Sequence, residues 1–356
     1  MRNSRDKLVR SDFLKSLAAE LRQQFYIFPH MRIDGDALAS AVAAEALLLA
    51  QGKEAVIVLN EPLPSNLLAF ARTNNYLVYG EDKLPWEAGE AASFVVDCHE
   101  PKRLGDRAEL WNAEALYIVD HHLCPEPILA NQLIDSTAAS AAQLMASLLL
   151  EFADESALAH HELIDERLAT ALMMGVYSDT GGLRYANVTP ELYELLAKLR
   201  RLGAKLEQVN LELFNRQSLA GQRLKAHVLS NFEVLAEGEL AYMAVSNEQR
   251  EKFGATEDDF EGLVNELLAT VGVHYAVLLR EQPNFAWRIS FRAEVPYEVA
   301  GIAKKYGGGG HKQAAGASIS VERQVELYGE KAAFREFGKD LAQAILAGEG
   351  EGDLGC

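Results

Sequence analysis

Short apolar runs alternate with longer helical patterns through the first half of the chain. The runs typical of buried strands are 25–28, 55–59, 94–96 and 116–119, and the helical patterns are 37–50, 138–153 and 160–177. Strands that are apolar throughout and separated by helices indicate a parallel sheet with both faces covered. This part of the chain is therefore predicted to be a doubly wound α/β domain.

The pattern changes about two thirds of the way along the chain. Residues 232–235 with 240–245, and residues 276–280 with 286–291, are β-type runs on either side of a turn, which predicts two β-hairpins. A helical segment, a glycine-rich stretch, a short strand at 318–320 and a final helix are expected after them. The second part is therefore predicted to be a smaller α+β domain.

The two patterns define the expected domain organisation. An α/β domain at 1–190 is joined by a charged helical connector at 191–226 to the α+β domain at 227–345. Residues 346–356 carry glycine and acidic residues without periodicity, so a disordered tail is expected there.

Net charge narrows the range of partners. The 356 residues include 34 basic and 52 acidic side chains, a formal net charge of −18, which disfavours a protein that coats long nucleic acid. A single phosphate-binding cleft stays compatible with this charge, because bound metal and local side chains set the field there. No apolar run reaches the roughly 18 residues of a membrane span. The N-terminus predicts an amphipathic helix without a signal-peptide core.

The cysteines indicate a reducing compartment. Cys98, Cys124 and Cys356 lack the paired spacing of a zinc finger or a disulfide framework, so a cytoplasmic location is expected. Cys124 closely follows a histidine pair, which raises the alternative of a metal ligand. A free thiol beside the site is the favoured interpretation.

Ionisable side chains stand directly after the predicted strands. The first strand leads into His30, Asp34 and Asp36. Loops at the carboxyl ends of parallel strands form the ligand crevice of a doubly wound sheet, and carboxylate with imidazole suits Mn²⁺ or Mg²⁺. Gly35 is expected to tighten this turn. The alternative is that the two aspartates only form an Asx turn or cap the following helix.

The same arrangement recurs along the chain. Later strand and helix ends carry Asp97, Asp120, His121, His122 and Asp179. So many carboxylates after buried strands are hard to explain by packing alone. We therefore expect the loops to converge on a divalent-metal centre.

Charge counting predicts two ions in this centre. The four carboxylates of Asp34, Asp36, Asp97 and Asp179 carry −4 in total and match two divalent cations. Asp97 lies between the other motifs in the sequence and is the expected bridging and catalytic carboxylate. Two divalent metal ions that share a carboxylate can together hydrolyse a phosphate ester.

The adjacent histidines are expected to differ in role. Neighbouring residues at a strand end point in opposite directions, so both are not expected to bind one ion equally. We assign His121 to metal and His122 to the substrate phosphate or leaving oxygen. Asp120 is expected to orient both neighbours, as a catalytic residue that acts through them.

A glycine run suggests a phosphate-binding loop in the second domain. Gly307–Gly310 precede His311 and Lys312, and exposed N–H groups ahead of a helical segment would form an anion nest. A flexible linker is the alternative. Between Arg280 and Lys312, six basic residues including Arg292 stand against three acidic ones, a local charge of +3. This basic strip is expected to contact the substrate.

The segments FPHMRIDGDALAS, VVDCHE, IVDHH and SDTGG, in this order, resemble the four motifs of the DHH phosphoesterase family. GGGGHKQAAGA resembles the signature of the DHH-associated C-terminal domain. The resemblance implies a catalytic domain at 1–190, a substrate-binding domain at 227–345 and two divalent ions, most often Mn²⁺, with Mg²⁺ and Co²⁺ as alternatives. The metal ligands that it implies are His30, Asp34, Asp36, Asp97, His121 and Asp179.

The resemblance also implies residues that bind the nucleotide. It places Arg292 and the loop of Gly308, Gly309, Gly310 and His311 on the substrate, and Arg280 is a further candidate from the basic strip. His99 is less usual for the family, and two roles stay open for it: a contact with the metal site or a contact with the substrate.

At this length the chain resembles the family members that hydrolyse very short RNA to nucleoside 5′-monophosphates and often also dephosphorylate 3′-phosphoadenosine 5′-phosphate. The main alternative is a phosphodiesterase for linear or cyclic dinucleotides such as pApA and cyclic di-AMP, because both share every catalytic residue. A RecJ-like exonuclease on single-stranded DNA is less favoured, since the 356 residues leave no room for its further DNA-binding domains. A catalytically inactive nucleotide sensor is disfavoured by the full ligand set. A homodimer stays open.

Overall fold

The computed structural model describes residues 2–71, 76–124, 129–284, 286–310, 312–329 and 334–348 of the chain. The chain forms two compact units, Met1–Arg216 (unit 1) and Gln217–Cys356 (unit 2). The division falls inside the predicted connector at 191–226, so helix α6 (Pro190–Arg201) belongs to unit 1 and helix α8 (Leu219–Asn231) to unit 2. The predicted domain borders stay predictions.

Unit 1 is built on a parallel sheet of six strands in the order β3-β2-β1-β4-β5-β6. Its strands are β1 (Gln24–Phe28), β2 (Glu54–Leu59), β3 (Tyr76–Val78), β4 (Ala92–Val96), β5 (Leu116–Asp120) and β6 (Gln132–Ile134). Strands β2 and β3 are added on one side of β1, and β4, β5 and β6 are added on its other side. The strand order therefore reverses between β1 and β4, the place where doubly wound sheets bind ligands. The predicted α/β class is confirmed, whereas the short edge strands β3 and β6 were not predicted.

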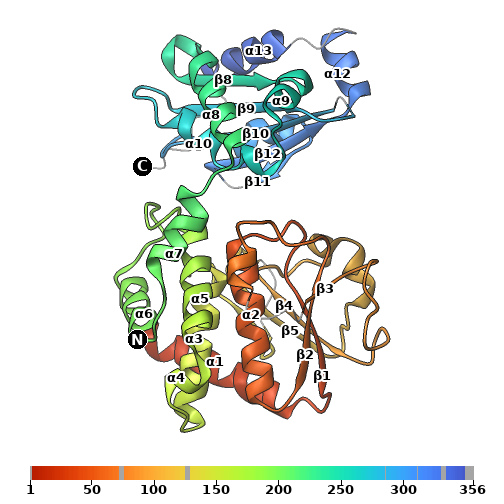
Figure 1. Ribbon diagram of the computed structural model, residues 1–356, viewed down its shortest axis with the longest axis vertical. Helices are drawn as coiled ribbons and strands as arrows, with labels where there is room; N and C mark the ends of the chain where they lie inside the picture. The colour runs from red at the N-terminus through yellow and green to blue at the C-terminus, as the bar shows by residue number, and fades with distance from the viewer. Residues whose placement is uncertain are drawn as a thin grey trace. The chain divides into compact units, whose positions relative to one another are not determined.

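Alternate residues of the strands enter two different cores. Phe25 and Ile27 of β1 pack with the main helices, whereas Tyr26 and Phe28 pack on the opposite face. Figure 1 shows α2, α3 and α5 side by side along the helical face. Helices of unit 1 are α1 (Arg2–Ala19), α2 (Gly35–Ala50), η1 (Leu68–Phe70), η2 (Pro101–Leu110), α3 (Ala141–Glu155), α4 (His160–Leu163), α5 (Glu166–Asp179), α6, α7 (Leu206–Asn210) and η3 (Leu211–Asn215). The second face is covered by η2 and loops, so the strands are apolar on both sides.

The predicted helix at 160–177 is two helices in the structure, α4 and α5. Asp165 separates them, because its backbone is extended and its side chain accepts a hydrogen bond from the Leu168 amide, 2.8 Å away. This is an N-cap, which begins a new helix. The second helix, α5, ends at Asp179 and so places that carboxylate.

Unit 2 is built on a mixed sheet in the order β11-β12-β10-β9-β8-β7. Its strands are β7 (Glu233–Leu235), β8 (Leu240–Val245), β9 (Tyr275–Glu281), β10 (Trp287–Ala293), β11 (Gly309–Gly310) and β12 (Ala314–Ile319). Its helices are α8, η4 (Ala236–Gly238), α9 (Asn247–Phe253), η5 (Asp258–Phe260), α10 (Leu263–Leu268), α11 (Ala300–Lys305), α12 (Val321–Tyr328) and α13 (Phe334–Leu346). Both predicted hairpins, β7–β8 and β9–β10, are antiparallel pairs and are confirmed. The end of the predicted tail, 349–356, lies outside the described residues.

The two faces of this second sheet differ in cover. One face packs against α11 and α13, and the other packs against α8 and α10, which cover β8 and β9, with α10 also contacting β10. On that second face, Arg288, Ser290 and Arg292 of β10 are only half-buried, and Gly316 and Ser318 of β12 are exposed. Part of the sheet therefore presents polar and basic side chains to solvent.

Candidate metal centre

The predicted ligands of unit 1 meet at one edge of its sheet. They come from the loops after β1, β4 and β5 and from the end of α5, beside the point where the strand order reverses. Among the described residues, three overlapping groups of side chains have ligand atoms within 4.8 Å of one another. Together they contain His30, Asp34, Asp36, Asp97, His121, His122 and Asp179.

The first group consists of His30, Asp34 and Asp97. His30 Nε2 lies 3.6 Å from Asp34 Oδ2 and 3.2 Å from Asp97 Oδ2. The other ring nitrogen, Nδ1, is 2.7 Å from the Met31 carbonyl oxygen, which is a hydrogen bond when Nδ1 carries the proton. That bond leaves Nε2 as the atom that faces the carboxylates.

The second group is centred on His121. Its Nε2 lies 3.2 Å from Asp179 Oδ2, 3.4 Å from Asp97 Oδ1 and 3.8 Å from Asp36 Oδ2. Asp97 thus faces both groups, with Oδ2 toward His30 and Oδ1 toward His121. A carboxylate between two donor groups has the geometry of a bridging ligand.

The backbone angle of Asp97 and the local hydrogen bond of Asp34 orient these two carboxylates. Asp97 has a φ of 56°, in the left-handed region that Asp and Asn enter more readily than bulky residues. Asp34 caps α2, because its Oδ1 accepts from the Ala37 amide at 3.0 Å, and its Oδ2 faces His30. The alternative role of a helix cap is therefore real for Asp34, and it leaves one oxygen for the site.

Asp36 is held by the start of another helix. Its two oxygens accept hydrogen bonds from the Ala141 and Ala142 amides at the N-terminus of α3, each 2.7 Å long. The side chain is fully buried, and the positive end of the helix dipole favours its negative charge. Asp36 therefore fixes the N-terminus of α3 next to the metal-compatible side chains.

Two glycines allow α2 and α5 to approach each other closely. A Cβ on Gly35 would lie 2.6 Å from Met174 Sδ, and one on Gly175 would lie 2.7 Å from the Cβ of Ala39. The expectation that Gly35 tightens the turn needs correction, because it stands in the first turn of α2 without a positive φ. Its role is to bring the loop after β1 and the end of α5 to one place.

The donor atoms of the centre fit divalent cations. Within the described residues, Asp97 Oδ1 and His121 Nε2 are buried without a hydrogen-bond partner, which is costly for polar atoms. Ligand atoms about 2.1 Å from an octahedral ion are roughly 3 Å apart, close to the 3.2 Å between His121 Nε2 and Asp179 Oδ2. Oxygen with imidazole nitrogen is a suitable donor set for divalent ions of this kind.

Electrostatics lead to the same conclusion. Burial by itself lowers the pKa of His30, but Asp34 and Asp97 outweigh it and raise the pKa to about 10. In the same way Asp179 and Asp97 raise the pKa of His121 to about 12 against the effect of burial. Burial also raises the pKa of Asp36 and Asp179, and nearby carboxylates add to this. The two imidazoles favour their protonated forms because carboxylates surround them, and a divalent cation would balance the same excess of negative charge.

A second hydrogen-bonded group adjoins the first. Asp120 is fully buried, and its Oδ1 lies 2.7 Å from His122 Nδ1 and 2.8 Å from the His121 amide, while its Oδ2 lies 2.5 Å from His99 Nδ1. Burial opposes ionisation of Asp120, but His122 and His99 lower its pKa below the usual value. Asp120 thus sets the orientation of both imidazoles, and His99 reaches the site through Asp120.

Sequence reasoning did not identify Arg103, which also lies in this group. Its Nη1 is 3.2 Å from His122 Nε2, and its carbonyl oxygen accepts from the Met31 amide at 2.8 Å. The residue belongs to η2, a segment for which no helix or strand was predicted, and the signal was a basic side chain six positions after Asp97. Arg103 adds a cation beside the carboxylates of the centre.

The cysteines near the site differ in exposure. Cys98 is buried, and burial raises the pKa of its thiol to about 12. Cys124 is partly exposed and belongs to none of the metal-compatible groups found among the described residues. Metal ligation by Cys124 therefore stays the less favoured alternative, and Cys356 lies outside the described residues.

The predicted substrate residues of unit 2 occupy two places. Arg292 lies on β10, one strand away from Gly310 across β12. Arg280 lies on β9, where its guanidinium contacts Glu257. His311 lies outside the described residues.

The expectation of an open anion nest before a helix is wrong for the described glycines. Gly309 and Gly310 pair with β12, and the Gly308 amide donates to the Ala303 carbonyl. Residues 314–319 form strand β12, in line with the alternation of buried and exposed side chains there. Gly308 is required for close approach, because a Cβ would lie 2.1 Å from the Gly316 carbonyl oxygen.

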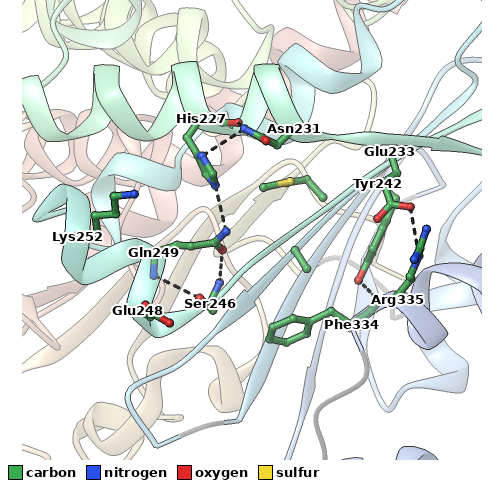
Figure 2. A pocket seen from close by; sticks show the side chains of 12 residues that line it. His227, Asn231, Glu233, Tyr242, Ser246, Glu248, Gln249, Lys252, Phe334 and Arg335 are labelled. Carbon is green, nitrogen blue, oxygen red and sulfur yellow. Dashed lines mark hydrogen bonds and ion pairs between the residues drawn. The ribbon is translucent and has the colours of Figure 1, made fainter.

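Unit 2 also contains a pocket of about 540 Å³ between α8, β8, α9 and the start of α13. Figure 2 shows several of its polar groups paired with one another, such as His227 with Gln249 at 3.1 Å and the Tyr242 hydroxyl with the Phe334 backbone carbonyl at 2.7 Å. None of the predicted site residues lines this pocket. The candidate catalytic chemistry therefore stays with unit 1.

Comparison with known proteins identifies both units. The DHH family N-terminal domain matches residues 24–176, and the DHHA1 domain matches residues 237–335. The bifunctional oligoribonuclease and PAP phosphatase NrnA of Thermus thermophilus is 31% identical over 301 residues, which are 83% of this chain and 83% of that protein. The cyclic-di-AMP phosphodiesterase PdeA of Listeria monocytogenes is 26% identical over 223 residues, 61% of this chain and 31% of that protein.

A solved structure has a similar fold. An exopolyphosphatase-related protein from Bacteroides fragilis superposes with a TM-score of 0.82 at 22% sequence identity, over 96% of this chain and 97% of that one. Among the described helices, none has the length and apolar character to cross a membrane.

Proposed function

The chain belongs to the DHH family of phosphoesterases, and from this premise we propose that it hydrolyses very short oligoribonucleotides to nucleoside 5′-monophosphates. The same centre is proposed to remove the 3′-phosphate of 3′-phosphoadenosine 5′-phosphate, the second activity in the name of the Thermus thermophilus relative. The observation that carries the proposal is the position of Asp97, whose Oδ2 lies 3.2 Å from His30 Nε2 and whose Oδ1 lies 3.4 Å from His121 Nε2.

Two divalent cations, most suitably Mn²⁺, are proposed as the cofactors, with Mg²⁺ and Co²⁺ as alternatives. His30, Asp34 and Asp97 would hold one ion, and Asp36, His121 and Asp179 would hold the other. Asp97 would contribute to the second ion through Oδ1, which lies 3.4 Å from His121 Nε2. Such a pair of ions activates water and neutralises charge on a phosphate ester. The buried Asp97 Oδ1 and His121 Nε2 support this assignment, because cation binding would satisfy both atoms.

The remaining side chains of the centre are proposed to act on the substrate phosphate. With Nδ1 bonded to Asp120, His122 presents Nε2 beside Arg103. The Arg103 guanidinium can donate to phosphate oxygens, and His122 Nε2 can do so when it also carries a proton. Asp120 keeps the two nitrogens of His122 in distinct roles, as carboxylates do for histidines in metal sites. His99 supports Asp120 from its other oxygen and is proposed to act through Asp120.

Unit 2 is proposed to bind the rest of the nucleotide. Arg292 supplies a guanidinium on the open part of the sheet, and Gly308, Gly309 and Gly310 supply backbone close to it. Arg280 and His311 complete the proposed substrate set. The partner is a short RNA or a dinucleotide, since a chain of −18 has a poor field for coating a long polymer.

A phosphodiesterase of linear or cyclic dinucleotides is the second candidate. The match to the Listeria monocytogenes protein, over 61% of this chain, favours it. The two candidates use the same proposed catalytic groups, so they differ only in substrate.

A substrate panel tests the proposal. The full chain with Mn²⁺ is expected to hydrolyse RNAs of two to five nucleotides and 3′-phosphoadenosine 5′-phosphate, and to act more slowly on cyclic di-AMP. Mononucleotide release is measured by chromatography, with a chelator as the control. Faster turnover of cyclic di-AMP than of any RNA would favour the second candidate, and turnover that persists with the chelator would refute the metal assignment.

A further inference from the structure

In unit 2, three arginines surround the carboxylate of Glu257. This arginine cluster is separate from Arg292. Arg280 Nη1 and Arg288 Nη1 lie 3.3 and 3.4 Å from Glu257 Oε2, and Arg250 Nη1 lies 3.8 Å from Glu257 Oε1. The side-chain Nε2 of Gln282 donates to the same Glu257 Oε1 at 3.3 Å. Three guanidinium groups thus converge on the Glu257 carboxylate, within a chain whose net charge is −18.

The strand register makes this arrangement unfavourable without an anion. Arg280 of β9 and Arg288 of β10 are direct cross-strand partners, and like charges opposite each other destabilise a sheet. Arg280 is 8% exposed and lies over the Phe260 ring at 5.1 Å, so its charge is held in place. An anion between the guanidinium groups therefore stabilises the cluster.

Glu257 supplies this anion only loosely. Its contacts with the three arginines are 3.3 to 3.8 Å long, whereas charge-assisted hydrogen bonds are about 2.7–2.9 Å. The side chain is 39% exposed and comes from the segment before η5, outside the sheet. A ligand with a higher negative charge can compete for the same guanidinium groups.

The position on the sheet indicates which ligand this is. Arg288 and Arg292 stand on the same face of β10, four residues apart, a separation of roughly 13 Å along the strand. Between them Ser290 is half-buried, and the facing residues of β12, Gly316 and Ser318, are exposed and small. A chain with repeated anionic groups can follow this surface from one arginine to the other.

We propose that Arg288, with Arg250 and Arg280, forms a second anion subsite that binds a phosphate of an oligonucleotide beyond the one at Arg292, in place of Glu257. The proposal rests on the proposed function and extends it, since the subsite would favour RNAs longer than a dinucleotide. It makes Glu257 an internal competitor, whose removal strengthens the binding of longer substrates.

The test compares two substrates and three variants of the full chain with Mn²⁺. The substrates are the dinucleotide pApA and a five-nucleotide oligoadenylate, and kcat/KM is measured for each. Arg288→Gln is expected to lower kcat/KM about tenfold more for the pentanucleotide than for pApA. Glu257→Gln is expected to raise it severalfold for the pentanucleotide. Arg323→Gln, on α12 and paired with Glu326 at 2.6 Å, removes the same charge elsewhere and is expected to change neither.

Salt dependence gives a readout that a purely structural ion-pair cluster would not change. The anisotropy of a fluorescein-labelled pentanucleotide is measured against salt concentration, and Arg288→Gln is expected to reduce the log–log slope by about 0.7, the contribution of one phosphate of a single strand. Equal losses on both substrates, or weaker pentanucleotide binding by Glu257→Gln, would overturn the subsite. If the wild type hydrolyses neither RNA, the proposed function fails, while the anisotropy still tests the subsite.

Discussion

The two units use charge in opposite ways. Unit 1 buries carboxylates at loop ends, where Asp36 and Asp97 are almost fully enclosed, whereas unit 2 carries arginines on a half-open strand face. Buried carboxylates in excess need cations for their own stability, whereas the half-buried Arg288 and Arg292 keep contact with water. Catalysis and substrate binding are therefore separable, and we expect variants of unit 1 to change kcat and variants of unit 2 to change KM.

Removal of the shared carboxylate should have the largest effect. Asp97→Asn keeps the shape of the side chain and tolerates the left-handed backbone, but it removes the charge that faces both donor groups. We expect kcat on a short RNA to fall by at least about 10³-fold, more than the loss of one preorganised donor. Asp154→Asn, on the exposed end of α3, is the matched control and should retain wild-type turnover. Substantial turnover by Asp97→Asn would refute its bridging role.

Removal of the orienting carboxylate should have a smaller effect. Asp120→Asn cannot accept from both His99 Nδ1 and His122 Nδ1 as the carboxylate does, so both rings lose their fixed orientation. A loss of about 10–100-fold in kcat is expected, with little change in KM. Initial rates at saturating and limiting RNA separate the two constants. An effect confined to KM would place Asp120 with the binding residues.

The smallest of these effects belongs to unit 2. Arg292→Gln should raise KM for a short RNA about tenfold, because one charge-assisted contact is lost, and should leave kcat within about twofold. Arg323→Gln serves again as the charge-matched control. An unchanged KM would remove Arg292 from the substrate site, and a large fall in kcat would end the separation of roles between the units.

Much of unit 1 could be predicted because its signals are local. Apolar runs followed by Asp97 or Asp120 specify a strand and the loop at its end, and parallel strands bring such loops to one edge. The edge strands β3 and β6 were missed because three residues are too few for a pattern. The break at Asp165 was missed because helical periodicity continues across it.

Contacts between distant segments could not be predicted. The double hydrogen bond from the start of α3 to Asp36 depends on the packing of α3 against α2, over a separation of 105 residues. Arg103 reaches His122 only because η2 folds over the second face of the sheet. The glycine run was interpreted as a nest, but its backbone pairs with β12, a partner that local sequence does not reveal.

The proposed chemistry of unit 1 requires two divalent ions that share Asp97. Equilibrium dialysis of the full chain against Mn²⁺ counts these ions without reference to any substrate. We expect two bound ions per chain for the wild type and for Asp154→Asn, and at most one for Asp97→Asn. A single ion in the wild type, or two ions retained by Asp97→Asn, would refute the shared site.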